Sequence, residues 1–189
     1  MLPGMARMLV MDDELRTAKD NAGISALAVY GGPLLPEDVY NSACSFAPKG
    51  PSCPEGSGPD YDFGSPAILV NAGNGRQLLL AGQKSGIVWA LDPARDGEII
   101  WDARVAAGGI NGGVQWGMAA DDGQVYAASS DVVITRTPTA RILDPRSGGG
   151  LTALRIADGS RAWHAPPLAC GTRENCSPAQ LAALTVIPG

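Results

Sequence analysis

A repeated pattern of short strands is the feature that most constrains the fold of this chain. Two segments, "GIVWALDPARDGEIIW" and "GGLTALRIADGSRAW", each carry Ala-Leu, then a glycine, then a tryptophan four residues after that glycine. The repeat pairs Gly97 with Gly159 and Trp101 with Trp163. Repeats of antiparallel strands at this scale are typical of β-propellers, in which radially arranged sheets pack against one another. We therefore expect an all-β chain that forms part of a propeller, with two to three blades. The alternative is a sandwich that contains two similar hairpins by chance.

Apolar runs separated by turn residues predict the individual strands. They place strands at 66–70, 76–82, 86–92, 98–105, 116–120, 124–130, 150–156 and 161–166. Asn-Gly and Asp-Gly pairs predict turns within 71–75, 93–97, 120–123 and 157–159, because these residues tolerate positive φ angles. We expect residues 35–189 to form the partial propeller.

The first 34 residues do not continue this pattern. A short helix is expected at 11–23 and a strand at 24–30, but neither has an evident partner. Residues 1–34 are therefore an unassigned segment, which we expect to be the least ordered part of the chain. The pattern of a signal peptide is also missing, because the charged stretch 11–20 follows only a very short apolar one.

Composition argues against several classes of partner. The net charge is −5, so the chain lacks the basic footprint of a nucleic-acid-binding protein. No apolar run approaches the roughly 18 residues that a membrane-spanning helix needs. The 25 glycines and 15 prolines suit short strands joined by tight turns, and they disfavour a helical bundle.

The four cysteines occur as two close pairs. Cys44 and Cys53 bracket one polar loop, and Cys170 and Cys176 bracket another. A zinc site is disfavoured, because the spacing is not Cys-x-x-Cys and His164 is the only histidine. Two local disulfides are expected if the chain is exported, which would indicate an oxidising compartment, whereas a cytosolic chain would keep four reduced thiols. No Cys-x-x-Cys-His motif occurs, so we expect no covalent haem.

Several ordered blocks resemble a known family. They are "DVYNSAC", "GPDYDFGSPAIL", "GQKSGIVWALD", "GGVQWGMAAD" and "CSPAQLAALTVIPG". Together with the Ala-Leu-Asp…Gly…Trp repeat they resemble the quinoprotein dehydrogenases, most of all the polyvinyl-alcohol dehydrogenase branch, over about residues 35–189. The resemblance implies a fragment of an eight-bladed propeller that binds pyrroloquinoline quinone (PQQ) and a calcium ion. It also implies oxidation of a primary or secondary alcohol by hydride transfer to PQQ.

The resemblance also implies site residues. Asp60, followed by "YDFGSPAIL", matches the family's catalytic base and a possible calcium contact, and Lys84 in "QKSG" matches a cation that is both catalytic and cofactor-binding. Asp62 is the rival for the base. An alcohol releases hydride readily only as its hydroxyl proton leaves, so a carboxylate is needed within about 3 Å. A fixed ammonium stabilises the charge that then develops on the quinone oxygen. Without the resemblance, Asp60 and Lys84 would be an ordinary turn residue and a solvated hairpin lysine.

Further positions match less closely. Gln115 and Trp116 in "GGVQWGMA" match family positions near the polar edge of the cofactor, with glutamine in place of the family's Asn or Glu. Their ordinary alternative is a strand start with a packed tryptophan. We expect His164 to be solvated or to cap a strand. Three other tryptophans are expected to pack between blades: Trp89, Trp101 and Trp163.

The resemblance implies an external electron acceptor such as a cytochrome c and a periplasmic or secreted location. We expect the chain to be inactive alone, because two or three blades leave the cofactor with one wall and no upstream calcium ligands of the family are matched. One competing interpretation is a non-catalytic propeller scaffold of the outer-membrane assembly type, which would share the repeat without needing Asp60 and Lys84. Another is an unrelated secreted β-sandwich held by two disulfides.

Overall fold

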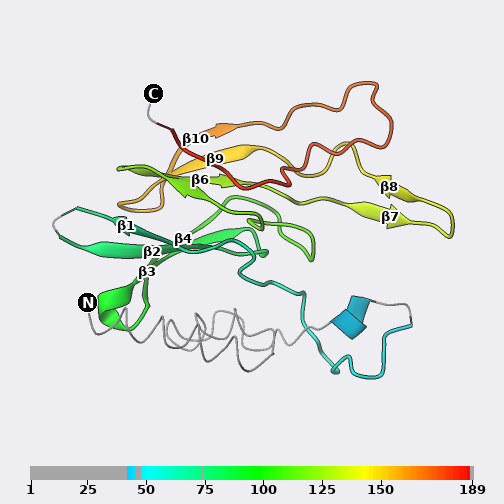
Figure 1. Ribbon diagram of the computed structural model, residues 1–189, viewed down its shortest axis with the longest axis horizontal. Helices are drawn as coiled ribbons and strands as arrows, with labels where there is room; N and C mark the ends of the chain where they lie inside the picture. The colour runs from blue at the N-terminus through cyan, green and yellow to red at the C-terminus, as the bar shows by residue number, and fades with distance from the viewer. Residues whose placement is uncertain (1–41, 46–47, 74, 188–189) are drawn as a thin grey trace.

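The computed structural model describes residues 42–45, 48–73 and 75–187. The expected helix at 11–23, the expected strand at 24–30 and the whole segment 1–34 lie outside these residues. The described part is built of strands, with two short 3-10 helices, η1 (Ser42–Ser45) and η2 (Pro93–Arg95). It contains two four-stranded antiparallel sheets and one two-stranded hairpin (Figure 1).

The first sheet follows the order of the sequence. Its strands are β1 (Ile68–Asn71), β2 (Gln77–Gly82), β3 (Ile87–Asp92) and β4 (Glu98–Arg104), each paired with the next. Tight turns with positive φ at Gly75, Gly86 and Gly97 connect them. The predicted strands at 66–70, 76–82, 86–92 and 98–105 are confirmed to within two residues.

The second sheet has the order β10-β9-β6-β5. Its strands are β5 (Ala119–Ala120), β6 (Gln124–Ala128), β9 (Leu151–Arg155) and β10 (Arg161–Ala165). All four predicted strands are present, but β5 is shorter than the expected 116–120. Residues 116–118 do not pair, because Gly117 has φ 128°, which ordinary strand pairing does not allow.

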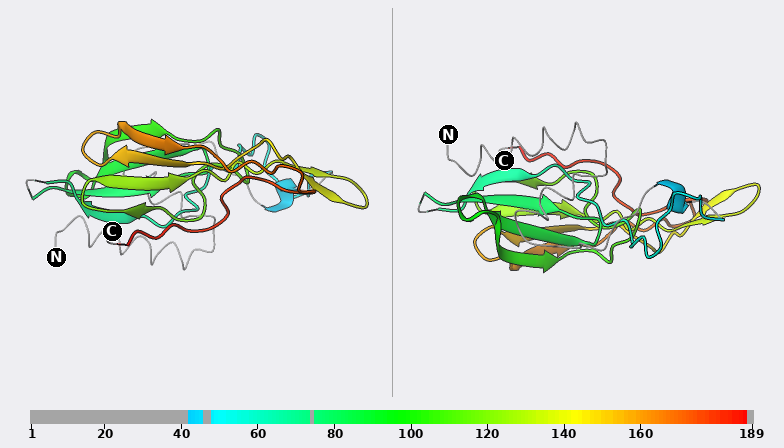
Figure 2. Two further views of the ribbon diagram at one scale, coloured as in Figure 1. Left: turned by 90° about the horizontal axis from the view of Figure 1, so that it is seen from above. Right: turned by 90° about the horizontal axis from the view of Figure 1, so that it is seen from below.

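The hydrophobic core lies between the two sheets, which stack as two layers (Figure 2). The first sheet contributes Leu78, Leu80, Val88 and Ala90, which are at most 1% exposed. The second contributes apolar side chains of β6 and β9: Val125, Ala127 and Leu154. Face-to-face packing of four-stranded antiparallel sheets is the arrangement of neighbouring propeller blades. The predicted all-β, partial-propeller fold is therefore confirmed, with two blades.

Trp101 on β4 joins the two sheets. Its indole N–H donates to the carbonyl of Ile156 at 2.8 Å, and its ring lies where a Cβ on Gly159 would be. Gly159 also has φ 71°, so an L side chain at this turn is disfavoured twice. The prediction that Trp101 packs between blades is confirmed.

Trp163 and Trp89, which were also expected to pack between blades, each contact residues of their own sheet. Trp163 contacts the ring of Tyr126 at a centroid distance of 5.8 Å and is 41% exposed on the outer face of the second sheet. Trp89 is half-buried and donates from Nε1 to the Gln83 side-chain oxygen at 3.2 Å. Neither lies between the two described sheets.

A hairpin that the sequence pattern did not predict extends beyond the sheets. It consists of β7 (Ile134–Arg136) and β8 (Arg141–Leu143) and occupies the connection between β6 and β9 (Figure 1). The side-chain oxygen of Asn175 accepts a hydrogen bond from Leu143 N at 3.0 Å, which ties the hairpin to a later loop.

Both expected disulfides are present. Cys44 and Cys53 are joined with a Cα–Cα distance of 4.9 Å, and Cys170 and Cys176 with 5.8 Å. Both distances lie in the usual range for a disulfide. The alternative of four reduced thiols is therefore wrong in this structure.

None of the described residues belongs to a helix of the length and apolarity that a bilayer crossing requires.

Candidate active site

Lys84 lies in the turn between β2 and β3, at one end of the first sheet. It is buried, with 9% of the residue exposed. Its backbone N–H donates to the carbonyl oxygen of Asp62 at 2.9 Å, which fixes the turn against the chain that leads into β1. The expectation of a solvated hairpin lysine, which applies when the resemblance is ignored, is therefore wrong.

Two carboxylates share the Lys84 ammonium. Lys84 Nζ donates to Asp60 Oδ2 at 3.0 Å and to Asp62 Oδ2 at 2.8 Å. The Asp60 side chain is 14% exposed and that of Asp62 is 36% exposed. The structure thus brings together the two rival aspartates and the lysine, in a cluster with one positive and two negative formal charges.

Asp60 has a backbone conformation that L residues rarely adopt. Its φ is 66°, in the left-handed region, where aspartate is better tolerated than most residues. Such strain, of order 1–3 kcal/mol, is found disproportionately at functional sites. Here the unusual φ accompanies the turn of a carboxylate toward Lys84, two residues before the second carboxylate.

Burial and charge shift the acidity of this cluster. Burial raises the pKa of Asp60; the hydrogen bond from Lys84 opposes this shift, and the nearby charge of Asp62 adds to it. For Lys84, burial alone would lower the pKa, but the hydrogen bonds to Asp62 and Asp60 outweigh it and raise the pKa above its usual value. Lys84 therefore stays an ammonium, and Asp60 is the carboxyl that takes up a proton more readily than usual.

Gln115 and Trp116 lie beside this end of the sheet, without a direct contact to Lys84 that the structure records. Gln115 packs against Gly64, where an added Cβ would lie 3.0 Å from the Gln115 carbonyl oxygen. The preceding residue, Val114, donates from its backbone N–H to Gln83 O at 3.0 Å, so the segment adjoins the Lys84 turn. Trp116 is 47% exposed, so it is not packed against the described part of the chain.

His164 lies on the surface, away from this cluster. The residue is exposed, and its Nδ1 is 3.0 Å from Thr152 Oγ1. This placement at the end of β10 agrees with the expected solvated role.

Two polar residues near Lys84 were not anticipated from the sequence. Gln83 is fully buried, and its Oε1 accepts from Ser85 and Trp89, while its Nε2 has no hydrogen-bond partner in the described part of the chain. Asp131 accepts three backbone N–H groups, from Ala107, Gly108 and Gly113. The sequence offers one hint of Asp131: it lies three residues after the end of β6, in a segment that corresponds to Gln83–Ser85 after β2.

The pKa of Asp131 moves in the opposite direction to that of Asp60. Burial alone would raise it, but the backbone hydrogen bonds from Gly113, Ala107 and Gly108 outweigh burial and hold the pKa below its usual range. Asp131 therefore remains a carboxylate that accepts hydrogen bonds. It lines a cavity of about 480 Å³ together with the loop 107–112, residues 132–134, Ser147 and Gly148.

The described residues do not make a metal site by themselves. No group of three or more His, Cys, Asp or Glu side chains within 42–45, 48–73 and 75–187 is arranged to hold a metal ion. Asp60 and Asp62 offer two carboxylates, whereas calcium takes six to eight oxygen ligands. A calcium ion at Asp60 would need ligands from elsewhere and would compete with the Lys84 ammonium.

Two curated proteins align with most of this chain. A polyvinylalcohol dehydrogenase of Pseudomonas sp is 42% identical over 158 residues, and another of Sphingopyxis sp. (strain 113P3) is 39% identical over 163 residues. These alignments cover 81% and 82% of the chain. By sequence, this chain is related to the polyvinylalcohol dehydrogenases. The resemblance predicted from the sequence blocks is confirmed.

The polyvinylalcohol dehydrogenase-like chain corresponds to only part of its relatives. It spans 22% and 24% of the lengths of the two curated proteins. No family model matches it. Among solved structures it is similar to a europium-containing methanol dehydrogenase, with 17% identity, a TM-score of 0.39, and coverage of 57% of this chain and 16% of the other. BamB from Moraxella catarrhalis matches with 18% identity, a TM-score of 0.28, and coverage of 52% and 35%.

Proposed function

We propose that this chain supplies part of the active site of a PQQ-dependent alcohol dehydrogenase, with Asp60 as the proton acceptor and Lys84 as the cation beside it. The observation that carries the proposal is the convergence of Asp60 and Asp62 on Lys84, from positions 24 and 22 residues away in the sequence. The curated relatives are named for polyvinyl alcohol, so a secondary alcohol of this kind is the proposed substrate. Residues 35–189 are proposed as the propeller portion.

The residues at this end of the sheet fit PQQ in kind. The buried ammonium of Lys84 suits an oxygen that gains negative charge, and the preceding residue, Gln83, has a buried Nε2 donor without a hydrogen-bond partner among the described residues. The exposed indole of Trp116 offers an aromatic face to a planar ring, with Gln115 beside it. When bound, PQQ supplies a quinone carbon that accepts hydride.

Asp60 holds the proton in this proposal. A general base works best when its pKa lies near the working pH, and burial moves the pKa of Asp60 in that direction. Lys84 orients the Asp60 carboxylate through the 3.0 Å hydrogen bond and remains positively charged. Asp62, which is more exposed and lies closer to Lys84, is proposed as the counter-ion that keeps the lysine in place.

We also propose a location, an electron acceptor and a metal ion for this protein. The two disulfides agree with a periplasmic or secreted location, since disulfides persist in oxidising compartments. An external electron acceptor such as a cytochrome c is proposed because the two electrons that the cofactor gains with the hydride must leave it again. A calcium ion near Asp60 is proposed only with ligands from parts of the protein beyond the described residues.

The test is to express the protein encoded by the full reading frame that contains this chain. Its turnover of an alcohol is then measured with PQQ, calcium and a dye acceptor. Asp60→Asn should lower kcat by roughly 10² or more, because a positioned base contributes about 10²–10⁴. Asp62→Asn is the matched control and should have the smaller effect. The reverse order would assign the base to Asp62. Near-normal turnover in both variants would overturn the roles proposed for Asp60 and Asp62. Absence of turnover in the unchanged protein would favour a non-catalytic propeller scaffold.

The same assay on the 189-residue chain alone should show negligible turnover. Its described residues supply only one side of the proposed cofactor site. A site that is open on the other sides leaves water at the reacting atoms. Turnover comparable to that of the longer protein would contradict this expectation.

A further inference from the structure

Asp131, at the end of β6 in the second sheet, lies close to the loop that holds the Lys84 turn of the first sheet. From this arrangement we infer that Asp131 is a positioning residue that keeps Lys84 beside Asp60. The inference rests on the proposed function in so far as the placement of Lys84 matters for turnover. The mechanical link itself can be tested without any cofactor or substrate.

The carboxylate of Asp131 is fully occupied by one loop and one serine. Its Oδ1 accepts from Gly113 N at 2.7 Å and from Gly108 N at 3.0 Å. Its Oδ2 accepts from Ala107 N at 2.8 Å and from Ser129 Oγ at 3.0 Å. Three backbone amides 18 to 24 residues away therefore converge on one side chain, which fixes the shape of the loop 107–113.

The same loop holds the Lys84 turn from the other side. Gly109 N donates to Lys84 O at 3.1 Å, and Val114 N donates to Gln83 O at 3.0 Å. At Gly113 the approach is so close that an added Cβ would collide with the Lys84 carbonyl oxygen. A change in the shape of this loop must therefore move the backbone of Lys84, and with it the ammonium that Asp60 and Asp62 share.

A second group also contacts the turn and could hold it independently. Arg104 on β4 donates from its guanidinium to Ser85 O at 2.6 Å, and with longer bonds to Ala106 O and Ala107 O. If Arg104 were sufficient, removal of the Asp131 carboxylate would leave the turn unchanged. The experiment must therefore separate these two possibilities.

Asp121 provides a matched control in the same sheet. Its Oδ1 accepts from Gly123 N and Gln124 N, and its Oδ2 accepts from the Tyr126 hydroxyl. It thus has the same type of partners as Asp131, but all of them lie within five residues, at the opposite end of β6. Asp121→Asn disturbs a comparable turn without touching the loop at Lys84.

The experiment compares Asp131→Asn with Asp121→Asn in the 189-residue chain by NMR. An asparagine keeps one acceptor oxygen but places an NH2 donor where the other oxygen accepts hydrogen bonds, so the loop 107–113 should loosen. The amide protons of Gly109 and Val114 should exchange about tenfold faster or more in Asp131→Asn than in Asp121→Asn. The titration midpoint of the Asp60 carboxyl should also move upward, because the hydrogen bond from Lys84 lowers it and Asp62 opposes that effect.

The outcomes separate positioning from ordinary stabilisation. Faster exchange together with a shifted Asp60 midpoint supports the inference. Faster exchange with an unchanged midpoint overturns it, because the loop would then be loosened without moving Lys84. Unchanged exchange also overturns it and assigns the turn to Arg104. Because no cofactor is present, none of these results depends on whether the dehydrogenase proposal holds.

A milder variant covers the case in which Asp131→Asn does not fold. Ser129→Ala removes one donor to Asp131 and keeps the carboxylate and the three loop amides. It should accelerate exchange at Gly109 and Val114 about two- to threefold and move the Asp60 midpoint in the same direction. Values equal to those of the unchanged chain would overturn the inference.

Discussion

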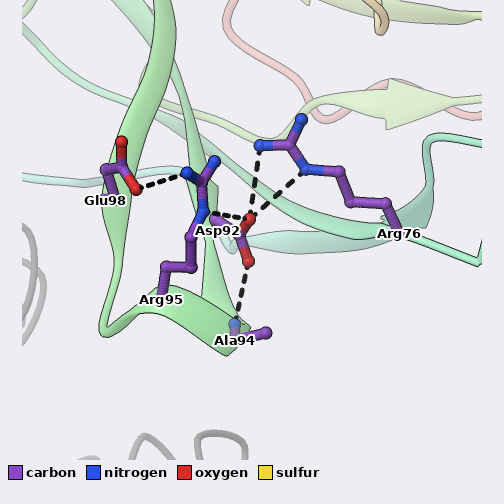
Figure 3. A network of polar contacts seen from close by, with 5 residues as sticks. All are labelled: Arg76, Asp92, Ala94, Arg95 and Glu98. Atoms are coloured by element: carbon purple, nitrogen blue, oxygen red, sulfur yellow. Dashed lines mark hydrogen bonds and ion pairs between the residues drawn. The ribbon is translucent and has the colours of Figure 1, made fainter.

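The two ends of the first sheet carry opposite arrangements of charge. At the end beside the β2–β3 turn, Lys84 is shared by Asp60 and Asp62. At the other end, Asp92 is shared by Arg76 and Arg95 (Figure 3). One cluster has a surplus of carboxylates around a cation, and the other a surplus of cations around a carboxylate.

The difference shows which carboxyl is structural. Asp92 accepts from Ala94 N at 2.9 Å and so caps η2, and Arg95 also reaches Glu98 at 2.8 Å (Figure 3). Burial alone would raise the pKa of Asp92, but the hydrogen bonds from Arg95 and Ala94 N and the charge of Arg76 outweigh it and lower the pKa. A carboxyl with a surplus of donors stays ionised and holds a turn. Burial raises the pKa of Asp60, which is the carboxyl that we propose for proton transfer.

The largest expected effect on folding is at the cation of the first cluster. The Lys84 side chain is only 11% exposed. Lys84→Met therefore leaves two carboxylates facing each other with no cation between them. Removing one partner of a buried ion pair is strongly destabilising, so the free energy of unfolding should fall by about 3 kcal/mol. Urea denaturation at pH 7 measures it.

The matched cation at the other end is Arg76, which is 41% exposed and leaves Arg95 in place when removed. Arg76→Met should therefore cost less than about 1 kcal/mol. Equal losses in the two variants would show that the two clusters are held alike and would end the contrast between them.

An intermediate effect is expected from the carboxylates. Asp92→Ala removes the cap of η2 and the shared partner of two arginines, and should lower the free energy of unfolding by about 1–2 kcal/mol. Asp60→Asn should cost less than this, since the ionised Asp60 is disfavoured by burial. Calorimetric Tm values of both variants test the order, and a larger loss for Asp60→Asn would make Asp60 a structural residue.

The smallest effect is a difference in the sign of the pH dependence. The pKa of Asp92 is lowered, so its contribution to stability is present above the unfolded pKa of about 3.9 and is lost as pH falls through the folded value. The pKa of Asp60 is raised, so its contribution is present below about 3.9 and is lost as pH rises through the folded value.

Urea denaturation from pH 3 to pH 7 measures this difference. The destabilisation caused by Asp92→Asn should grow as pH rises, whereas Asp60→Asn should become more favourable relative to the unchanged chain. Parallel curves for the two variants would show that the two carboxyls do not differ in acidity.

The inner blade strands, β2, β3, β6 and β9, were predictable because each has a buried face. β2 and β3 carry apolar residues that are almost fully buried, and Gly-containing turns bound both. β7 and β8 were missed because neither has a buried face; Ile142, for example, is 51% exposed. Alternation of apolar and polar residues cannot reveal a strand that has no fully buried face.

The sequence could predict only those contacts of the candidate site that join two side chains. Asp60 and Lys84 lie in recognisable sequence motifs, and in the structure Lys84 Nζ is 3.0 Å from Asp60 Oδ2. The part played by Asp131 was hidden, because its partners are backbone amides, which every residue except proline possesses. No sequence pattern distinguishes the amides of Ala107, Gly108 and Gly113 from any others.

The joint at Trp101 has a consequence for the order in which the chain acquires structure during synthesis. Its indole partner, the Ile156 carbonyl, is 55 residues farther along the chain. At ribosomal rates of about 5–20 residues per second, the first sheet leaves the ribosome on the order of 3–10 s before that partner. During this interval the indole lacks its hydrogen-bond partner at Ile156, and the part of the core that β9 supplies is not yet in place. The time for which the nascent chain is open to chaperones and proteases therefore depends on the rate of translation. Slower translation of residues 102–159 should lengthen that time.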